Sequence, residues 1–159
     1  MPILDFGWLG STSTQNVILT AGAVGTFFAI RTASKDARRR ATIDIVIHHQ
    51  KDEDLLAAKR TVTSLRRSGQ SLSSNLPGST EYQAILDVLN AYEFVSSGIR
   101  EGAFDEKIYK RVFCSMLIRD WEATAGFVLE LRNTTGKKTL FQDYEKLARR
   151  WERRPLKMG

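Results

Sequence analysis

Residues 17–30 read VILTAGAVGTFFAI, and basic residues follow directly. No charged residue occurs between Asp5 and Arg31, so residues 8–30 form an uncharged stretch of 23 residues. At about 1.5 Å per residue, a helix of that length spans roughly 34 Å, which is enough to cross a hydrocarbon layer of about 30 Å. The sequence therefore predicts an N-terminal segment with a membrane anchor over residues 1–30.

The residues on either side of this stretch predict its orientation. Trp8 lies at its start, where an aromatic side chain suits the membrane interface, and five cations follow its end: Arg31, Lys35, Arg38, Arg39 and Arg40. Cytoplasmic flanks of membrane helices carry an excess of Lys and Arg. We therefore expect a single-pass protein of the bacterial inner membrane with its N-terminus outside and its C-terminal domain in the cytoplasm. The polar run 11–16 leaves open the alternative of a core helix in a soluble bundle.

Three small residues in the apolar stretch, Ala21, Gly25 and Ala29, recur at four-residue spacing. Small side chains on one stripe allow two membrane helices to approach closely. This pattern predicts helix packing between copies and hence a homo-oligomer. Small residues are also common in membrane helices in general, so ordinary membrane composition is the alternative explanation.

The positive charge of the chain is concentrated in two places. The 159 residues carry a formal net charge of +6, and residues 31–40 and 145–159 each hold a net +4. Beside a membrane anchor, such charge suits anionic lipid head groups, at about 1 kcal/mol per Lys or Arg near the surface. Nucleic acid is a weaker candidate partner, because no recognisable nucleic-acid-binding motif occurs. The single Cys114 excludes an internal disulfide bond.

The rest of the sequence predicts helices throughout. Residues 31–67 continue the first helix as a basic collar and an amphipathic stalk. Residues 68–80, SGQSLSSNLPGST, predict a connector, and residues 81–159 a cytosolic helical domain. The inward faces expected of its first two helices are Tyr82, Ile85, Leu86, Leu89, Tyr92 and Val95 or Ser96, then Ile108, Val112 and Met116. Helix-capping signals in this domain are Ser79 or Thr80, Asp105, Gly136, and a capping box of Thr139 and Gln142. The expected fold class is all-α: one N-terminal transmembrane helix continuing into a long amphipathic helix, then a small helical bundle.

Candidate chemical sites are few. His48 and His49 are adjacent, so on a helix they point about 100° apart and cannot both bind one metal ion; we interpret them as polar surface. No catalytic, cofactor-binding or metal-binding motif was found, which predicts a protein that is not an enzyme. One charged and aromatic cluster is notable: Glu93, Arg100, Glu101, Arg119, Asp120 and Trp121.

Two interpretations of this cluster are open. Arginines among aromatic residues can hold an anionic ligand such as a nucleotide through forked hydrogen bonds and stacking. Alternatively, Glu93 or Glu101 pairs with Arg119 and the cluster joins two helices. We favour the structural interpretation.

Four segments resemble an uncharacterised family of small bacterial and prophage membrane proteins that contain a domain of unknown function. They are ATIDIVIHHQKDEDLL at 41–56, YEFVSSGIREGAFDEKIYKR at 92–111, IRDWE at 118–122 and LFQDYEKLARRW at 140–151. The resemblance implies an N-terminal membrane helix and an all-helical cytosolic domain, with no established activity.

These observations lead to one function hypothesis and two alternatives. The leading hypothesis is a membrane-anchored, non-enzymatic interaction protein that binds another protein and its own copies. The first alternative is a ligand-gated membrane effector of an anti-phage defence system, which senses a signalling nucleotide such as a cyclic oligonucleotide. The second is a prophage exclusion protein that acts on a host membrane protein.

Overall fold

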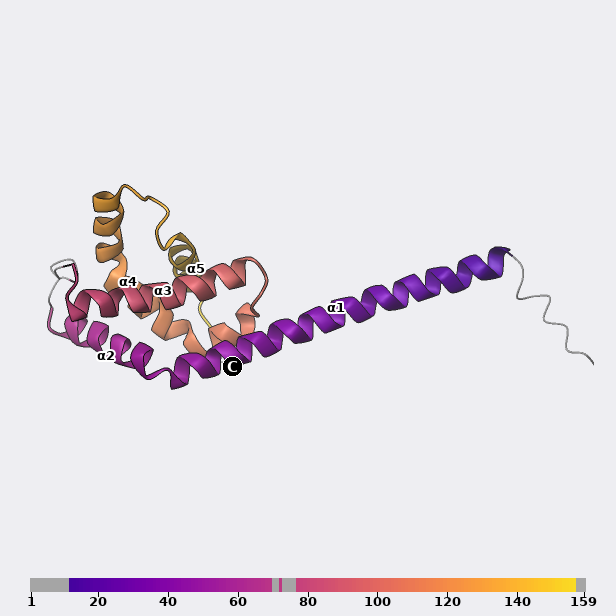
Figure 1. The fold of residues 1–159 in the computed structure, drawn as a ribbon, viewed down its shortest axis with the longest axis horizontal. Coiled ribbons are helices and arrows are strands. Elements are labelled where there is room, and N and C mark those ends of the chain that lie inside the picture. The colour runs from indigo at the N-terminus through magenta and orange to yellow at the C-terminus, as the bar shows by residue number, and fades with distance from the viewer. Residues whose placement is uncertain (1–11, 70–71, 73–76, 157–159) are drawn as a thin grey trace, which may run out of the picture. The chain divides into compact units, whose positions relative to one another are not determined.

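The computed structural model describes residues 12–69, 72 and 77–156, with side chains at residue 22 and from residue 25 onward. Within these residues the chain is helical and contains no strand, which confirms the all-α class (Figure 1). The helices are α1 (Thr12–Lys51), α2 (Glu53–Arg67), α3 (Thr80–Arg100), α4 (Glu106–Thr135) and α5 (Gln142–Arg153). The chain divides into two compact units, Met1–Ala37 and Arg38–Gly159, and α1 runs from the first into the second.

The first unit contains the predicted anchor. Phe27, Phe28 and Ile30 are 55%, 63% and 64% exposed. Among the helices of the described residues, none is both long and apolar enough to cross a membrane, so the predicted transmembrane helix is not confirmed. Trp8 lies outside the described residues.

The small-residue stripe belongs to the same unit. Gly25 and Ala29 are exposed, and a Cβ atom added at Gly25 would meet no atom within 4 Å. The side chain of Ala21 lies outside the described part of the structure. Helix pairing through this stripe remains a prediction.

The predicted uninterrupted helix over residues 31–67 is wrong, because α1 ends at Lys51 and α2 begins at Glu53. Asp52 lies between them with extended backbone (φ −70°, ψ 102°), and its carboxylate accepts a hydrogen bond from Leu55 N–H at 3.0 Å. This N-cap satisfies a backbone donor that the first turn of a helix leaves without a partner.

The turn at Asp52 makes α2 part of the bundle. Its apolar stripe of Leu55, Ala58 and Val62 is buried, and α2 packs against α3. The compact unit Arg38–Gly159 therefore includes the end of α1 and all of α2, which differs from the predicted domain start at residue 81. An amphipathic helix gains more stability by burying its apolar face than by remaining an isolated stalk.

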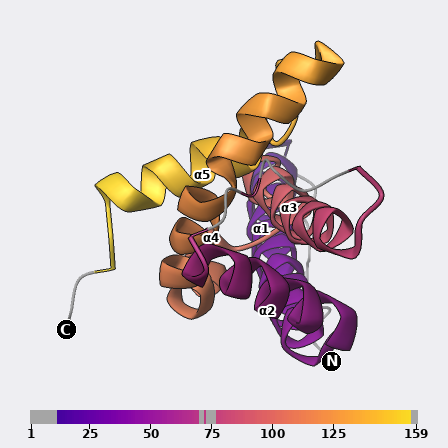
Figure 2. The same ribbon diagram turned by 90° about the vertical axis from the view of Figure 1, so that its left-hand side faces the viewer.

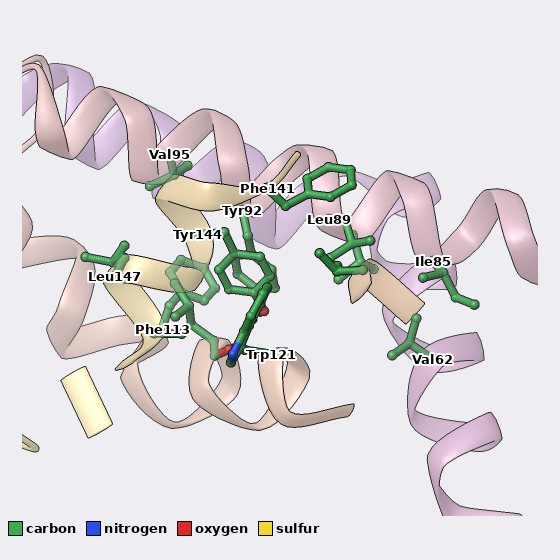
Figure 3. Close-up of a cluster of buried hydrophobic side chains, with 14 of the residues drawn as sticks. Val62, Ile85, Leu89, Tyr92, Val95, Phe113, Trp121, Phe141, Tyr144 and Leu147 are labelled. Atoms are coloured by element: carbon green, nitrogen blue, oxygen red, sulfur yellow. Dashed lines mark hydrogen bonds between the residues drawn. The ribbon is translucent and has the colours of Figure 1, made fainter. Parts of the chain in front are cut away.

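Aromatic residues dominate the core of the second unit. Tyr92, Tyr109, Tyr144 and Trp151 are the largest fully buried side chains. Figure 3 shows Tyr92 of α3 and Tyr144 of α5 side by side near Trp121 of α4. Helix α5 packs against both α3 and α4, and Figure 2 shows it crossing α4. Of the residues predicted to face inward on α3, Ile85, Leu89, Tyr92, Val95 and Ser96 are buried, whereas Tyr82 and Leu86 are half-buried.

The buried stripe of α4 differs from the predicted one. Val112, expected inside, is 40% exposed, whereas its neighbour Phe113 is 2% exposed. The stripe runs instead through Tyr109, Phe113 and Leu117. Both sets have the four-residue spacing of a helix face, so the pattern alone does not select between them. The bulkier aromatic set fills the core.

The capping signals were mostly correct. Ser79 accepts a hydrogen bond from Tyr82 N–H at 3.1 Å, and Asp105 accepts from Lys107 N–H at 2.9 Å. Gly136 ends α4 in the left-handed conformation, at φ 69°. The predicted capping box of Thr139 and Gln142 is wrong: the N-cap of α5 is Phe141, at φ 55°, and its side chain makes no capping hydrogen bond.

Candidate functional site

Glu93 provides the missing cap of α5 from another helix. Its carboxylate accepts hydrogen bonds from Tyr144 N–H at 2.7 Å and from Asp143 N–H at 3.3 Å. The first N–H groups of a helix need such acceptors, and a negative charge is favourable at this end of the helix dipole. Burial raises the pKa of the Glu93 carboxyl, and the two backbone N–H groups partly offset that rise.

Two more residues of α3 hold the start of α5 through Asp143. Arg100 Nη1 lies 2.6 Å from Asp143 Oδ2, and Ser97 Oγ donates to the same oxygen at 2.9 Å. Asp143 is 6% exposed. Arg100 also donates from Nε to Glu101 Oε1 at 2.8 Å, and its own side chain is 52% exposed. Positions 93, 97 and 100 are one turn apart, so a single face of α3 binds this helix end.

The remaining predicted residues lie on α4. Tyr92 Oη donates to Asp120 Oδ2 at 3.0 Å, and Arg119 Nε lies 3.8 Å from Asp120 Oδ1. Burial raises the pKa of the Asp120 carboxyl, and the bond from Tyr92 is the largest of the effects that lower it. The Trp121 ring meets Tyr144 edge-on, with ring centres 5.1 Å apart.

The predicted cluster is thus divided between two places in the bundle. Glu93 and Arg100 bind the start of α5 and Glu101 pairs with Arg100, whereas Asp120 and Trp121 are buried in the core. Among the described residues, no ion pair joins Arg119 to Glu93 or Glu101, so the predicted pairing is wrong. Glu93 instead accepts hydrogen bonds from the start of α5, and Glu101 pairs with Arg100. The sequence does not show where the start of α5 lies in the fold.

His49 lies in the core, which corrects its interpretation as polar surface. It is 4% exposed, and its Nδ1 atom lies 3.1 Å from Tyr109 Oη. Burial, with the nearby charge of Lys59, lowers the pKa of His49 to about 4. His48, in contrast, is exposed and lies 3.5 Å from Asp52 Oδ2. The spacing of 42, 45, 46 and 49 is that of one helix face and could have identified His49 as inward.

Lys59 is a half-buried cation that the sequence motifs did not predict. Its ammonium nitrogen lies 4.9 Å from the ring centre of Tyr92 and 5.2 Å from that of Phe113. Burial lowers the pKa of Lys59, while the charges of Asp120 and Asp52 partly offset this. Cation–π contacts compensate for part of the lost hydration of such a cation. Its position one residue after the buried Ala58 was the available signal.

Two hollows lie at the surface of the second unit. One, of about 430 Å³, we call the basic groove; it is lined by Arg39, Ile43, Asp105, Lys107, Ile108 and Arg111. The other, of about 480 Å³, we call the acidic cleft; it is lined by Ile45, His48, His49, Asp52, Asp54, Leu55, Asp87, Asn90, Ala91 and Phe94. Within the described residues, no group of three or more His, Cys, Asp or Glu side chains is arranged to hold a metal ion.

The fold and this network define an all-helical domain in which buried polar side chains join one helix to another. The chain belongs to the family described as a domain of unknown function, DUF4760, which matches residues 16–151. This match confirms the resemblance to an uncharacterised family and covers parts of both structural units. Comparisons with curated proteins and with solved structures gave no match.

Proposed function

We propose that this chain is a membrane-anchored, non-enzymatic interaction protein of the bacterial inner membrane, and that it binds its own copies. The observation that carries the proposal is the exposure of Phe27, Phe28 and Ile30, each of which is more than half exposed. An exposed apolar run needs an apolar partner, which a lipid bilayer or another anchor helix supplies. The uncharged sequence of residues 8–30 is consistent with this role.

The cations that follow support both lipid contact and orientation. Arg31, Lys35, Arg38, Arg39 and Arg40 are all exposed. Exposed cations next to an anchor are attracted to anionic head groups and favour the cytoplasmic side of the membrane. The proposed topology has the N-terminus outside and the domain from Arg38 onward in the cytoplasm.

The bonding of the charged cluster supports an interaction role over catalysis. Glu93 caps α5, Arg100 binds Asp143, and Asp120 accepts a hydrogen bond from Tyr92. These groups join helices within the chain. A cyclic oligonucleotide would have to displace Asp143 and Glu101 from Arg100, so the nucleotide-gated effector has less support. The prophage exclusion role rests on the resemblance alone.

Fractionation of cells that express the full chain tests the anchor. The protein is expected to remain in the membrane pellet after alkaline carbonate extraction, and a reporter fused after Gly159 is expected to report the cytoplasm. Phe28→Arg places a charge in the apolar run and is expected to release much of the protein. Leu129→Arg, at a residue of α4 that is 58% exposed, is the matched control. Carbonate release of the unmodified chain would overturn the anchor, and a periplasmic reporter the orientation.

Light scattering of the full chain in detergent tests self-association. A mass of two or more copies, stable on dilution into the micromolar range, is expected. A monomeric mass at every protein concentration would overturn this part of the proposal.

A further inference from the structure

The basic groove presents apolar side chains next to cations. Ile43 of α1 lines the groove and is 47% exposed, and Ile108 of α4 lines it as well. Three cations line the groove, Arg39, Lys107 and Arg111, against the single acid Asp105. The Asp105 carboxylate already caps α4 and lies 3.9 Å from Arg39 Nε. The groove therefore suits a partner that is both apolar and acidic.

The acidic cleft has the opposite character. Asp52, Asp54 and Asp87 line it without a lysine or arginine among its lining residues. Phe94 is 60% exposed at the cleft, although its ring also meets Phe104 edge-on at 5.8 Å. Asp87 receives a hydrogen bond from Gln83 at 2.7 Å, and neither Asp54 nor Asp87 has an ion pair with another described residue. The cleft suits a partner that is both apolar and basic.

The two surfaces lie on opposite flanks of α1. Arg39 and Ile43 belong to the basic groove, and Ile45, His48 and His49 to the acidic cleft. At about 100° per residue, the two sets centre roughly 150° apart around the helix axis. One copy cannot bring its own groove and cleft together, but it can offer the groove to one neighbour and the cleft to another.

We propose that copies of this chain associate head to tail, with the basic groove of one copy bound to the acidic cleft of the next. This inference rests on the proposed self-association and specifies its interface. The cations of the groove meet the carboxylates of the cleft, and Ile43 and Ile108 meet Phe94. Groove-to-groove and cleft-to-cleft contacts would repel, which excludes a symmetric dimer through either surface alone. Such a heterologous contact generates a ring or a filament.

A second copy explains more of the molecule than an anionic lipid surface does. Lipid head groups would complement the basic groove but would leave the acidic cleft and the exposed Phe94 without a partner. A neighbouring copy accounts for both surfaces, and each copy carries one of each.

Charge reversal of the full chain in detergent tests the interface. Arg111→Glu alters the groove and Asp87→Arg alters the cleft; both residues are exposed. Each variant alone is expected to show at least a tenfold weaker association than the unmodified chain. In an equal mixture of the two variants, the intact groove of one can bind the intact cleft of the other, so association is expected to recover to at least a dimer. Exposed residues outside both surfaces supply matched controls, Lys138→Glu and Glu130→Lys, which are expected to associate normally.

The outcomes separate this inference from the proposed function. If the unmodified chain is oligomeric and both reversals leave its mass unchanged, the head-to-tail interface is wrong and self-association stands. If Arg111→Glu changes only binding to anionic vesicles, the groove binds lipid and the inference fails. Circular dichroism checks that each variant is folded, and the milder pair Arg111→Gln and Asp87→Asn replaces any variant that is not. A mixture that remains monomeric while each control associates would also overturn the proposal.

Discussion

Glu93, near the middle of α3, caps the start of α5 by accepting a hydrogen bond from Tyr144 N–H at 2.7 Å. The local N-cap residue, Phe141, makes no such bond, so this helix depends on a side chain some fifty residues earlier in the chain. Replacement of Glu93 by Gln is expected to lower the free energy of unfolding by about 1–2 kcal/mol, because one oxygen acceptor and its charge are lost.

Urea denaturation of the full chain in detergent measures this effect. Glu101→Gln is the matched control, because the Glu101 side chain is 68% exposed and, among the described residues, pairs only with Arg100. The proposed role of Glu93 would be contradicted if both variants unfolded at the same urea concentration as the unmodified chain.

The low pKa of His49 predicts that part of the protein's stability is lost in acid. Its pKa is about 4 in the folded protein, against about 6.5 in an unfolded chain. Between these values the unfolded state binds more protons, so stability falls as pH decreases from about 6.5 to about 4 and falls no further below that. The full loss of unfolding free energy from this pKa difference is roughly 3 kcal/mol. The raised pKa values of Glu93 and Asp120 act in the opposite direction, because those carboxyls bind protons in the folded state first.

The contribution of His49 is measured as the difference in unfolding free energy between the unmodified chain and His49→Gln at each pH. Glutamine retains an acceptor for Tyr109 but does not titrate, so the difference is expected to shrink between pH 6.5 and pH 4. His48→Gln, at the exposed neighbour, is expected to change this dependence much less. A constant difference across that pH range would show that His49 is not the group responsible.

Replacement by alanine is expected to have opposite effects on stability at Gly98 and at Gly126. A Cβ atom at Gly98 would overlap the ring of Phe104, whereas one at Gly126 would meet nothing within 4 Å. Gly98→Ala is therefore expected to destabilise the protein by about 1–3 kcal/mol, through displacement of the ring. Gly126→Ala, inside α4, is expected to stabilise it by about 0.5–1 kcal/mol. Thermal unfolding followed by circular dichroism checks both, and equal shifts in the same direction would contradict the packing around Phe104.

The hydrogen bond from Tyr92 to Asp120 predicts a coupled pair. Tyr92→Phe leaves a buried carboxylate without its hydroxyl partner and is expected to cost about 1–3 kcal/mol. Asp120→Asn removes the buried charge, so the double variant is expected to lose less than the sum of the two single variants. Unfolding free energies of the four proteins measure the coupling. Tyr82→Phe, at a half-buried tyrosine, serves as the control, and additive single effects would show that the pair is not coupled.

The helix ends of the second unit show where local sequence was sufficient. Ser79 and Asp105 cap α3 and α4 as predicted, and Gly136 ends α4. A cap binds backbone groups within a few residues of itself, so its signal is contained in those residues. Asp52, followed by Glu53 and Asp54, carries the same kind of signal, and the break between α1 and α2 was predictable from it.

The inward faces were harder to predict. Val112 and Phe113 lie in stripes with the same spacing, and only the neighbouring helices decide which stripe enters the core. His49 shows the same difficulty, because a histidine suits a polar surface until Tyr109 and Phe113 are placed around it.

The all-helical class, several helix ends and the apolar, uncharged N-terminal stretch follow from the sequence alone, because each depends on residues that are close together in the chain. The folded structure was needed to show that Glu93 caps α5, that Arg100 pairs with Asp143, and that α2 belongs to the bundle. These contacts join residues that the folding of α3, α4 and α5 brings together, and helical periodicity within one segment contains no information about which partner another segment will supply.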